Sequence, residues 1–240
     1  QRYAADGVVI GSQDLGPLAG TGARAIALGS TAQFQRQARM AQPAQGRGNS
    51  ALSHVMKIEM DVAQAAAGLQ GNHAFKTNFP QGKFGNAVKT AAQVIASPAG
   101  VAAVRITLNG FDTHVNQPNI HANLLKQLGE GLASLKAALV ELGRWDRTLV
   151  MTYAEFGRRP QENGSNGTDH GTASAHFVTG GRVRGGLYGE TPQLDRLQNG
   201  NLAHAVDFRN LYATALERWW GVPAASALGG RYAPLDVLRA

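Results

Sequence analysis

The chain has 240 residues, with 23 basic against 16 acidic side chains and a formal net charge of +7. A hydrophobic fraction of 43% is typical of a globular protein rather than a disordered one. Cysteine is absent, which excludes disulfides and thiolate metal sites, and no apolar run reaches the roughly 18 residues of a membrane-spanning helix. The basic excess favours anionic partners, but the basic residues are scattered without interleaved aromatic residues, so we expect no dedicated nucleic-acid binding.

Glycines, prolines and changes of hydrophobic period divide the chain into strand-like and helix-like segments. Apolar stretches bounded by glycine predict short strands, and apolar residues three or four apart predict helices. In the first hundred residues, the expected elements are strands at 7–10 and 23–28, helices at 31–40, 50–69 and 86–96, an exposed linker at 42–49 and an irregular loop at 70–85.

The middle of the chain has the clearest pattern. Residues 101–108 form an apolar, β-branched run that predicts a buried strand, and residues 148–153 predict another. Between them, Ile120 and the leucines from Leu124 to Leu142 step by three and four, as on one face of a long helix. Strand, helix and strand predict a βαβ unit, with parallel strands and a right-handed crossover.

The last third of the chain is rich in loop signals. Residues 157–172 and 180–189 are rich in glycine, so both predict loops. Between them the apolar run 175–179 predicts a strand, which we expect to be antiparallel. Asp207 is placed to cap a helix over 208–219.

This alternation predicts an α/β protein with a mostly parallel sheet and helices on both of its faces, organised as a single domain over residues 1–240. In open parallel sheets, ligands bind beyond the carboxyl ends of the strands. Asp112 and His114 directly follow the first strand of the βαβ unit, and Glu155 and Arg158 follow its second strand. We therefore expect two carboxylates and an imidazole to meet at one edge of the sheet, with a guanidinium nearby.

The polar loop that follows adds Asn163, Asp169 and His170 as candidates for the same edge. Asp169 and His170 reach it if the strand after them is antiparallel or if the loop folds back over the site. Carboxylates and imidazoles without thiolates suit Zn²⁺, Mn²⁺ or Mg²⁺, and such a set fits metal-assisted hydrolysis, with Arg158 and Asn163 holding an anionic group. A polar loop network that only caps helices and binds backbone explains the same pattern equally well.

Two further histidines lie near these motifs. His121 is placed on the first turn of the long helix, seven residues after His114, from where it can reach the same edge. His176 begins an apolar run, so we expect it in the core. No adjacent base marks the hydroxyls of Ser165 or Thr168, so the sequence names no nucleophile.

Several ordered motifs carry a family resemblance. They are Phe111-Asp112-Thr113-His114 with Gln117, residues 148–152 leading to Glu155-Phe156-Gly157-Arg158, Glu162-Asn163-Gly164, Gly167-Thr168-Asp169-His170-Gly171, residues 178–181, and Asp207-Phe208-Arg209. Together they resemble domain-of-unknown-function family 1501, over most of the chain. That family is similar to the alkaline phosphatase and sulfatase superfamily, and most of its members have no assigned reaction.

The resemblance implies an alkaline phosphatase-like α/β sandwich with a metal site at the sheet edge, and hydrolysis of phosphate or sulfate esters. Asp112 and His114 match the family's Asp-Thr-His motif, and Asp169 and His170 match its Asp-His-Gly motif. Glu155 stands where the related hydrolases have an aspartate followed by a histidine. A phenylalanine follows it here, which removes one expected ligand.

The family's members are typically bacterial proteins exported by the twin-arginine route, which implies a periplasmic or secreted location. Their N-terminal glycine-rich segment corresponds to the part of the related hydrolases that supplies a metal-ligating aspartate and the nucleophile. This chain shows neither that segment nor a signal peptide, so we expect it to be the C-terminal, larger part of a longer precursor.

Three functions remain open on the sequence alone. The chain is a metal-dependent hydrolase of anionic esters, a non-catalytic exported scaffold that binds a partner protein or assembles into an oligomer, or a module that binds anions or polymers through its basic surface. A divalent ion near Asp112 and Glu155 favours the first reading, and an empty, hydrogen-bonded loop cluster favours the second.

Overall fold

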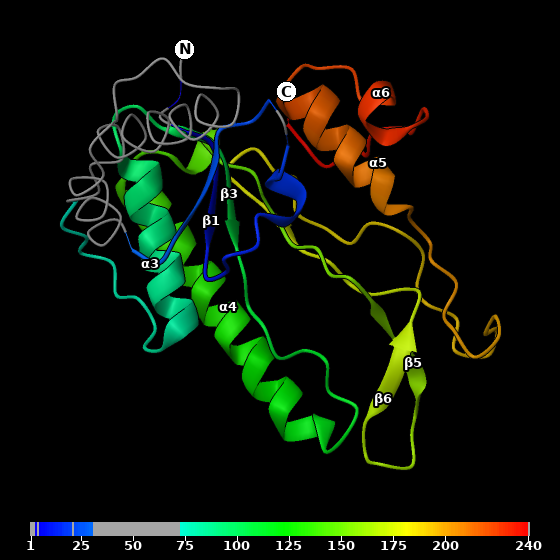
Figure 1. The fold of residues 1–240 in the computed structure, drawn as a ribbon. Coiled ribbons are helices and arrows are strands. Elements are labelled where there is room, and N and C mark those ends of the chain that lie inside the picture. The colour runs from blue at the N-terminus through cyan, green and yellow to red at the C-terminus, as the bar shows by residue number, and fades with distance from the viewer. Residues whose placement is uncertain (1–2, 4, 21, 31–72, 240) are drawn as a thin grey trace, which may run out of the picture. The chain divides into compact units, whose positions relative to one another are not determined.

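The computed structural model describes residues 3, 5–20, 22–30 and 73–239 (Figure 1). The chain divides into two compact units, which are Gln1–Asn109 with Leu125–Leu142, and Gly110–Leu124 with Gly143–Ala240. The expectation of a single domain stays a prediction. The helices expected at 31–40 and 50–69 and the linker expected at 42–49 lie outside the described residues.

A three-stranded parallel sheet with the strand order β2-β1-β3 lies at the centre of the first unit. Its strands are β1 (Ala5–Ile10), β2 (Ala25–Leu28) and β3 (Val101–Ile106). Val8 and Val9 point to opposite faces of the middle strand, and both are fully buried. A parallel strand that is covered on both faces reads as a continuous apolar run, which is why the sequence predicted these strands.

Helix α3 (Lys83–Ala96) packs on β1 and β3 and confirms the helix expected at 86–96. Its buried face presents Ala87, Ala91 and Val94 to the same apolar core as Val8 and Ile10. The two alanines allow the helix to approach the sheet closely. A short 3₁₀ helix, η1 (Gly16–Leu18), follows β1.

Helix α4 (Gln117–Glu141) confirms the expected long helix. Its residues up to Leu124 belong to the second unit, and the rest belong to the first. Near the carboxyl end, Leu135 and Leu139 are buried, whereas Ile120 and Leu125 are each 46% exposed. The predicted apolar stripe is therefore fully buried over only part of the helix.

Glu141 at the end of α4 binds the segment that precedes α3 through hydrogen bonds. Its carboxylate accepts the backbone N–H groups of Lys76 (2.8 Å) and Thr77 (3.0 Å) and the Thr77 hydroxyl (2.7 Å). These bonds, led by the one from Lys76, lower the pKa of Glu141 to about 2. The segment expected to be an irregular loop is thus fixed to the helix by a charged group.

The second unit contains two antiparallel strand pairs. Strand β4 (Val150–Met151) pairs with β7 (Val178–Thr179), which confirms the antiparallel direction expected for the apolar run 175–179. Strands β5 (Gly157–Glu162) and β6 (Thr168–Gly171) form a hairpin. A short 3₁₀ helix, η2 (Trp145–Arg147), precedes β4.

The C-terminal part of the second unit is helical. Helix α5 (Phe208–Ala213) runs into the π-helical segment η3 (Thr214–Trp219), and the short helix α6 (Ala225–Leu228) follows. Asp207 caps α5 as expected, because its side chain accepts the N–H of Arg209 at 2.9 Å.

Two expectations about strand pairing after residue 100 are wrong. β3 and β4 belong to different sheets, so the strand–helix–strand segment is not a βαβ unit. The only sheet that is parallel in the described part of the chain is therefore the one in the first unit. Residues 157–172 form a hairpin rather than a loop. Its strands carry no apolar alternation, and Pro160, which cannot donate to the ladder, coincides with a register shift between Arg158 and Glu162.

No helix among the described residues is long and apolar enough to cross a membrane.

Candidate metal centre

The loop between Gly110 and α4 carries Asp112 and His114. The chain turns at Gly110, whose φ of +106° is readily adopted by glycine. The side chain of Thr113 is buried, and its hydroxyl accepts a hydrogen bond from Nε2 of Gln117 at 2.9 Å. The loop is fixed through this buried threonine, while the side chains of Asp112 and His114 on either side of it stay 65% and 42% exposed.

The turn between β5 and β6 is locked to this loop by Asn163. Its Oδ1 accepts the N–H groups of Ser165 (2.9 Å) and Gly167 (3.1 Å), and its Nδ2 donates to the His114 carbonyl (3.1 Å). A Cβ on Gly167 would overlap the His114 carbonyl, so the close approach requires glycine. The hairpin thereby holds β6 beside Asp112 and His114.

Asp112, His114 and His170 converge on one point. Asp112 Oδ1 lies 2.7 Å from His170 Nε2 and 3.0 Å from His114 Nε2, and the two Nε2 atoms are 3.1 Å apart. The hydrogen bond with His170 is the main cause that lowers the pKa of the Asp112 carboxyl below its ordinary value. Among the described residues, these three make up the group of side chains that could hold a metal ion.

The donor set fits a divalent cation. Three mutual contacts cannot all be hydrogen bonds, because each imidazole Nε2 carries at most one proton and points it along one line. Ligand atoms about 3 Å apart are close enough together for Asp112, His114 and His170 to hold one divalent ion at ordinary metal–ligand distances of about 2.0–2.1 Å. Two imidazoles and one carboxylate suit Zn²⁺ or Mn²⁺ better than Mg²⁺, which prefers oxygen ligands.

The family model described as "Protein of unknown function (DUF1501)" matches residues 22–226. The chain belongs to the DUF1501 family. No curated protein and no solved structure matches the chain. The matched range of the DUF1501 chain includes the loop, the hairpin and α5.

Arg158, which we expected to hold an anion, instead donates hydrogen bonds to backbone carbonyls of this DUF1501 chain. Its Nη2 donates to the Phe111 carbonyl at 2.6 Å, and its Nη1 donates to the Thr168 carbonyl. Nη2 also lies 3.6 Å from Asp112 Oδ1, and the side chain is only 20% exposed. The guanidinium joins the 111–116 loop to the hairpin and adds positive charge beside the Asp112 carboxylate.

Asp169 and Asn163 lie beside the metal group rather than in it. Asp169 Oδ1 is 3.6 Å from His114 Nδ1, on the side of the ring away from Asp112. Asn163 Nδ2 reaches the same carboxylate oxygen at 3.3 Å, and this bond is the main cause that lowers the pKa of Asp169.

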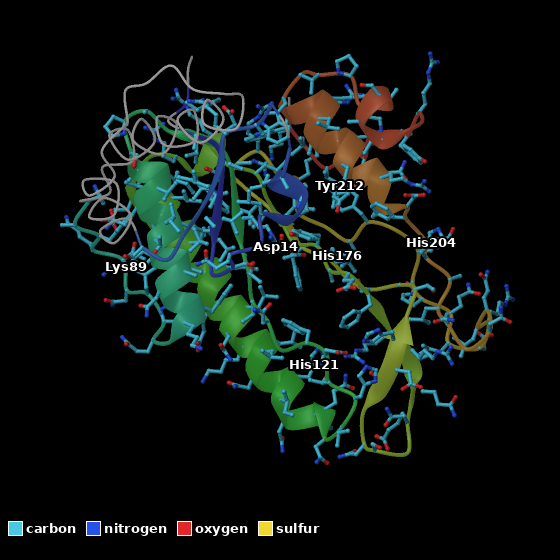
Figure 2. All side chains as sticks on the ribbon, in the orientation of Figure 1. Asp14, Lys89, His121, His176, His204 and Tyr212 are labelled. Atoms are coloured by element: carbon cyan, nitrogen blue, oxygen red, sulfur yellow. The ribbon has the colours of Figure 1, made fainter. Side chains whose placement is uncertain are left out.

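Glu155 and His121 do not join the three converging side chains. Glu155 is exposed on the bend before β5, and it is not among the ligand atoms that lie within 4.8 Å of one another. His121 lies on the first part of α4 (Figure 2). It packs edge-on against Phe111, with ring centroids 5.9 Å apart. The structure therefore places Glu155, the carboxylate that follows β4, outside the group that the sequence predicted.

His176 is exposed, so the expectation that it lies in a core is wrong. Its Nε2 lies 2.8 Å from the Ser174 hydroxyl, and Thr152 lies on the Nδ1 side at 3.4 Å. The local apolar run misled the prediction, because β7 contains only two paired residues and His176 precedes it.

Two contributions to the site were missed by the sequence analysis. The ring of Phe156 stacks on His170 with centroids 3.7 Å apart and an interplanar angle of 10°. Gln117 links the buried Thr113 to the hairpin by accepting a hydrogen bond from the Thr168 hydroxyl at 3.1 Å. Helical spacing offered no signal for the second contact, because Thr113 lies in the loop and α4 begins only at Gln117.

Proposed function

We propose that this chain is a metal-dependent hydrolase of phosphate or sulfate esters, with a fold of the alkaline phosphatase and sulfatase type. The observation that carries the proposal is the convergence of Asp112 Oδ1 with the Nε2 atoms of His114 and His170, all within about hydrogen-bonding distance. A divalent cation bound there supplies Lewis acidity toward an ester oxygen or a water molecule.

The protein's own groups prepare this chemistry. An imidazole can offer Nε2 to an ion only when its proton sits on Nδ1, so His114 and His170 would hold the ion as Nδ1–H tautomers. Asp112 supplies the one negative charge of the three, and Arg158 is held 3.6 Å from it by two backbone carbonyls. The exposed fractions of 42% to 65% leave the three side chains accessible to a substrate. The net charge of +7 favours an anionic one.

The proposal includes the location that the family resemblance implies, which is export by the twin-arginine route to the periplasm or beyond. It names no nucleophile. The Thr168 hydroxyl is already committed as a donor to Gln117, and Ser165 lies in the hairpin turn without a base beside it in the described structure.

One observation favours the alternative, a non-catalytic exported scaffold that binds a partner. The Arg158 guanidinium, which lies 3.6 Å from Asp112 Oδ1, holds two backbone carbonyls and is not free to bind a substrate anion. A scaffold needs the hydrogen bonds that join the loop to the hairpin, but it needs no free cationic side chain to bind a substrate.

Hydrolysis of p-nitrophenyl phosphate and p-nitrophenyl sulfate tests the proposal on the whole chain. The protein is stripped with a chelator, reloaded with Zn²⁺ or Mn²⁺ and assayed beside Asp112→Asn, with the exposed Asp195→Asn as the matched control. We expect turnover of one ester that chelation abolishes, that metal restores, and that only the Asp112 variant loses. Metal-loaded protein that turns over neither ester contradicts the hydrolase and leaves the scaffold.

A further inference from the structure

The two histidines of the converging group are held in different ways. His170 is held by its ring face, which lies flat against Phe156. His114 is held by its edge, because Asp169 Oδ1 lies 3.6 Å from Nδ1 while Asp112 Oδ1 lies 3.0 Å from Nε2. Two carboxylates therefore face opposite nitrogens of one imidazole.

We propose that Asp169 is a positioning residue that acts on the metal through His114, and not a ligand of the metal itself. The inference rests on the proposed metal binding. It assigns to Asp169 the role of fixing the tautomer and the direction of the His114 ring, and to Asn163 the role of fixing Asp169.

The geometry separates this role from direct ligation. A ligand of an ion at Nε2 must lie on the Nε2 side of the ring, and the three atoms that meet there are Asp112 Oδ1 and the two Nε2 atoms. Asp169 Oδ1 faces the other nitrogen. A carboxylate at that position favours the Nδ1–H tautomer and leaves the Nε2 lone pair for the metal.

Asn163 makes the arrangement rigid. The same Nδ2 group donates to Asp169 Oδ1 at 3.3 Å and to the His114 carbonyl at 3.1 Å, so one amide fixes the carboxylate and the backbone of the histidine that it faces. The Oδ1 of Asn163 is in turn fixed by two backbone N–H groups of the turn. Loss of the carboxylate therefore frees the ring while the backbone stays in place.

The test is a double-mutant cycle on metal affinity, measured for the whole chain by competition with a chromogenic chelator. Asp169→Asn keeps the size of the side chain and removes its charge, and the exposed Glu162→Gln on the neighbouring strand is the matched control. We expect Asp169→Asn to weaken Zn²⁺ binding by about 10- to 100-fold and the control to leave it unchanged. In a His114→Ala background, we expect Asp169→Asn to have no further effect.

A metal ligand gives a different pattern, because Asp169→Asn then weakens binding in the His114→Ala background as well. The absorption spectrum of bound Co²⁺ provides a second readout where His114→Ala binds too weakly to measure. We expect Asp169→Asn to keep the spectral shape, and a changed coordination number overturns the inference. Wild-type protein that binds no metal refutes the proposed function instead, whereas a wild type that binds metal as tightly as Asp169→Asn refutes only this inference.

Discussion

Arg158 is the residue whose observed role differs most from the role expected for it, and its substitution tests that role. Its guanidinium donates to two backbone carbonyls, of Phe111 and Thr168, and lies near Asp112. Charge-assisted hydrogen bonds contribute about 1.5–3 kcal/mol each. We expect Arg158→Met to lower the free energy of unfolding by about 3 kcal/mol, which is the lower end of that range for two bonds, because water can reach the partly exposed carbonyls. Arg158→Lys keeps the positive charge but not the two separate N–H donors of the guanidinium, and we expect it to lower the free energy of unfolding by about half as much.

Tryptophan fluorescence during denaturant unfolding is the suitable assay. Trp145, Trp219 and Trp220 all belong to the unit that contains Arg158, so the signal reports the unfolding of that unit. The exposed neighbour Arg159→Met is the control. Arg158→Met and Arg159→Met variants that unfold within about 0.5 kcal/mol of each other would refute the structural role of Arg158 and restore it as an anion-binding candidate.

Three further predictions concern stability. Leu139→Ala should cost about 2–5 kcal/mol in circular-dichroism melts, because Leu139 is fully buried, and a cost below about 0.5 kcal/mol would show that α4 is not packed there. Glu141→Gln should lower the melting temperature at pH 7, because the folded state stabilises the ionised carboxylate of Glu141. The difference in melting temperature from wild type should shrink as the pH falls from about 4.5 to about 2. A difference that is independent of pH, or one shared by Glu130→Gln, contradicts this. Gly167→Ala should destabilise the hairpin and weaken metal binding by displacing the His114 carbonyl, and wild-type melting and affinity would count against the close approach.

The first unit could be predicted from the sequence better than the second. β1, β2, α3 and α4 followed from apolar runs and helical spacing, because burial imposes those periods on the side chains. The pairing of β4 could not be predicted in the same way. An apolar run shows that a strand is buried, but it does not show which strand it pairs with, and β4 pairs with β7 rather than with β3.

The candidate site was predicted for a reason that only partly holds. We expected the carboxyl ends of two parallel strands to bring Asp112 and Glu155 together. Instead, the hairpin that follows Glu155 brings His170 to Asp112 and His114, and Glu155 stays outside the group. The hairpin is held by side-chain bonds to turn backbone and by close glycine contacts, which leave no hydrophobic period in the sequence.

The most direct test of the account is anomalous scattering at the zinc or manganese edge from crystals of the metal-loaded protein. The account predicts one strong peak that lies about 2.0–2.3 Å from Asp112 Oδ1 and from the Nε2 atoms of His114 and His170. No peak at that point in metal-soaked crystals, or a peak that is coordinated by Glu155 instead of these three side chains, would contradict it.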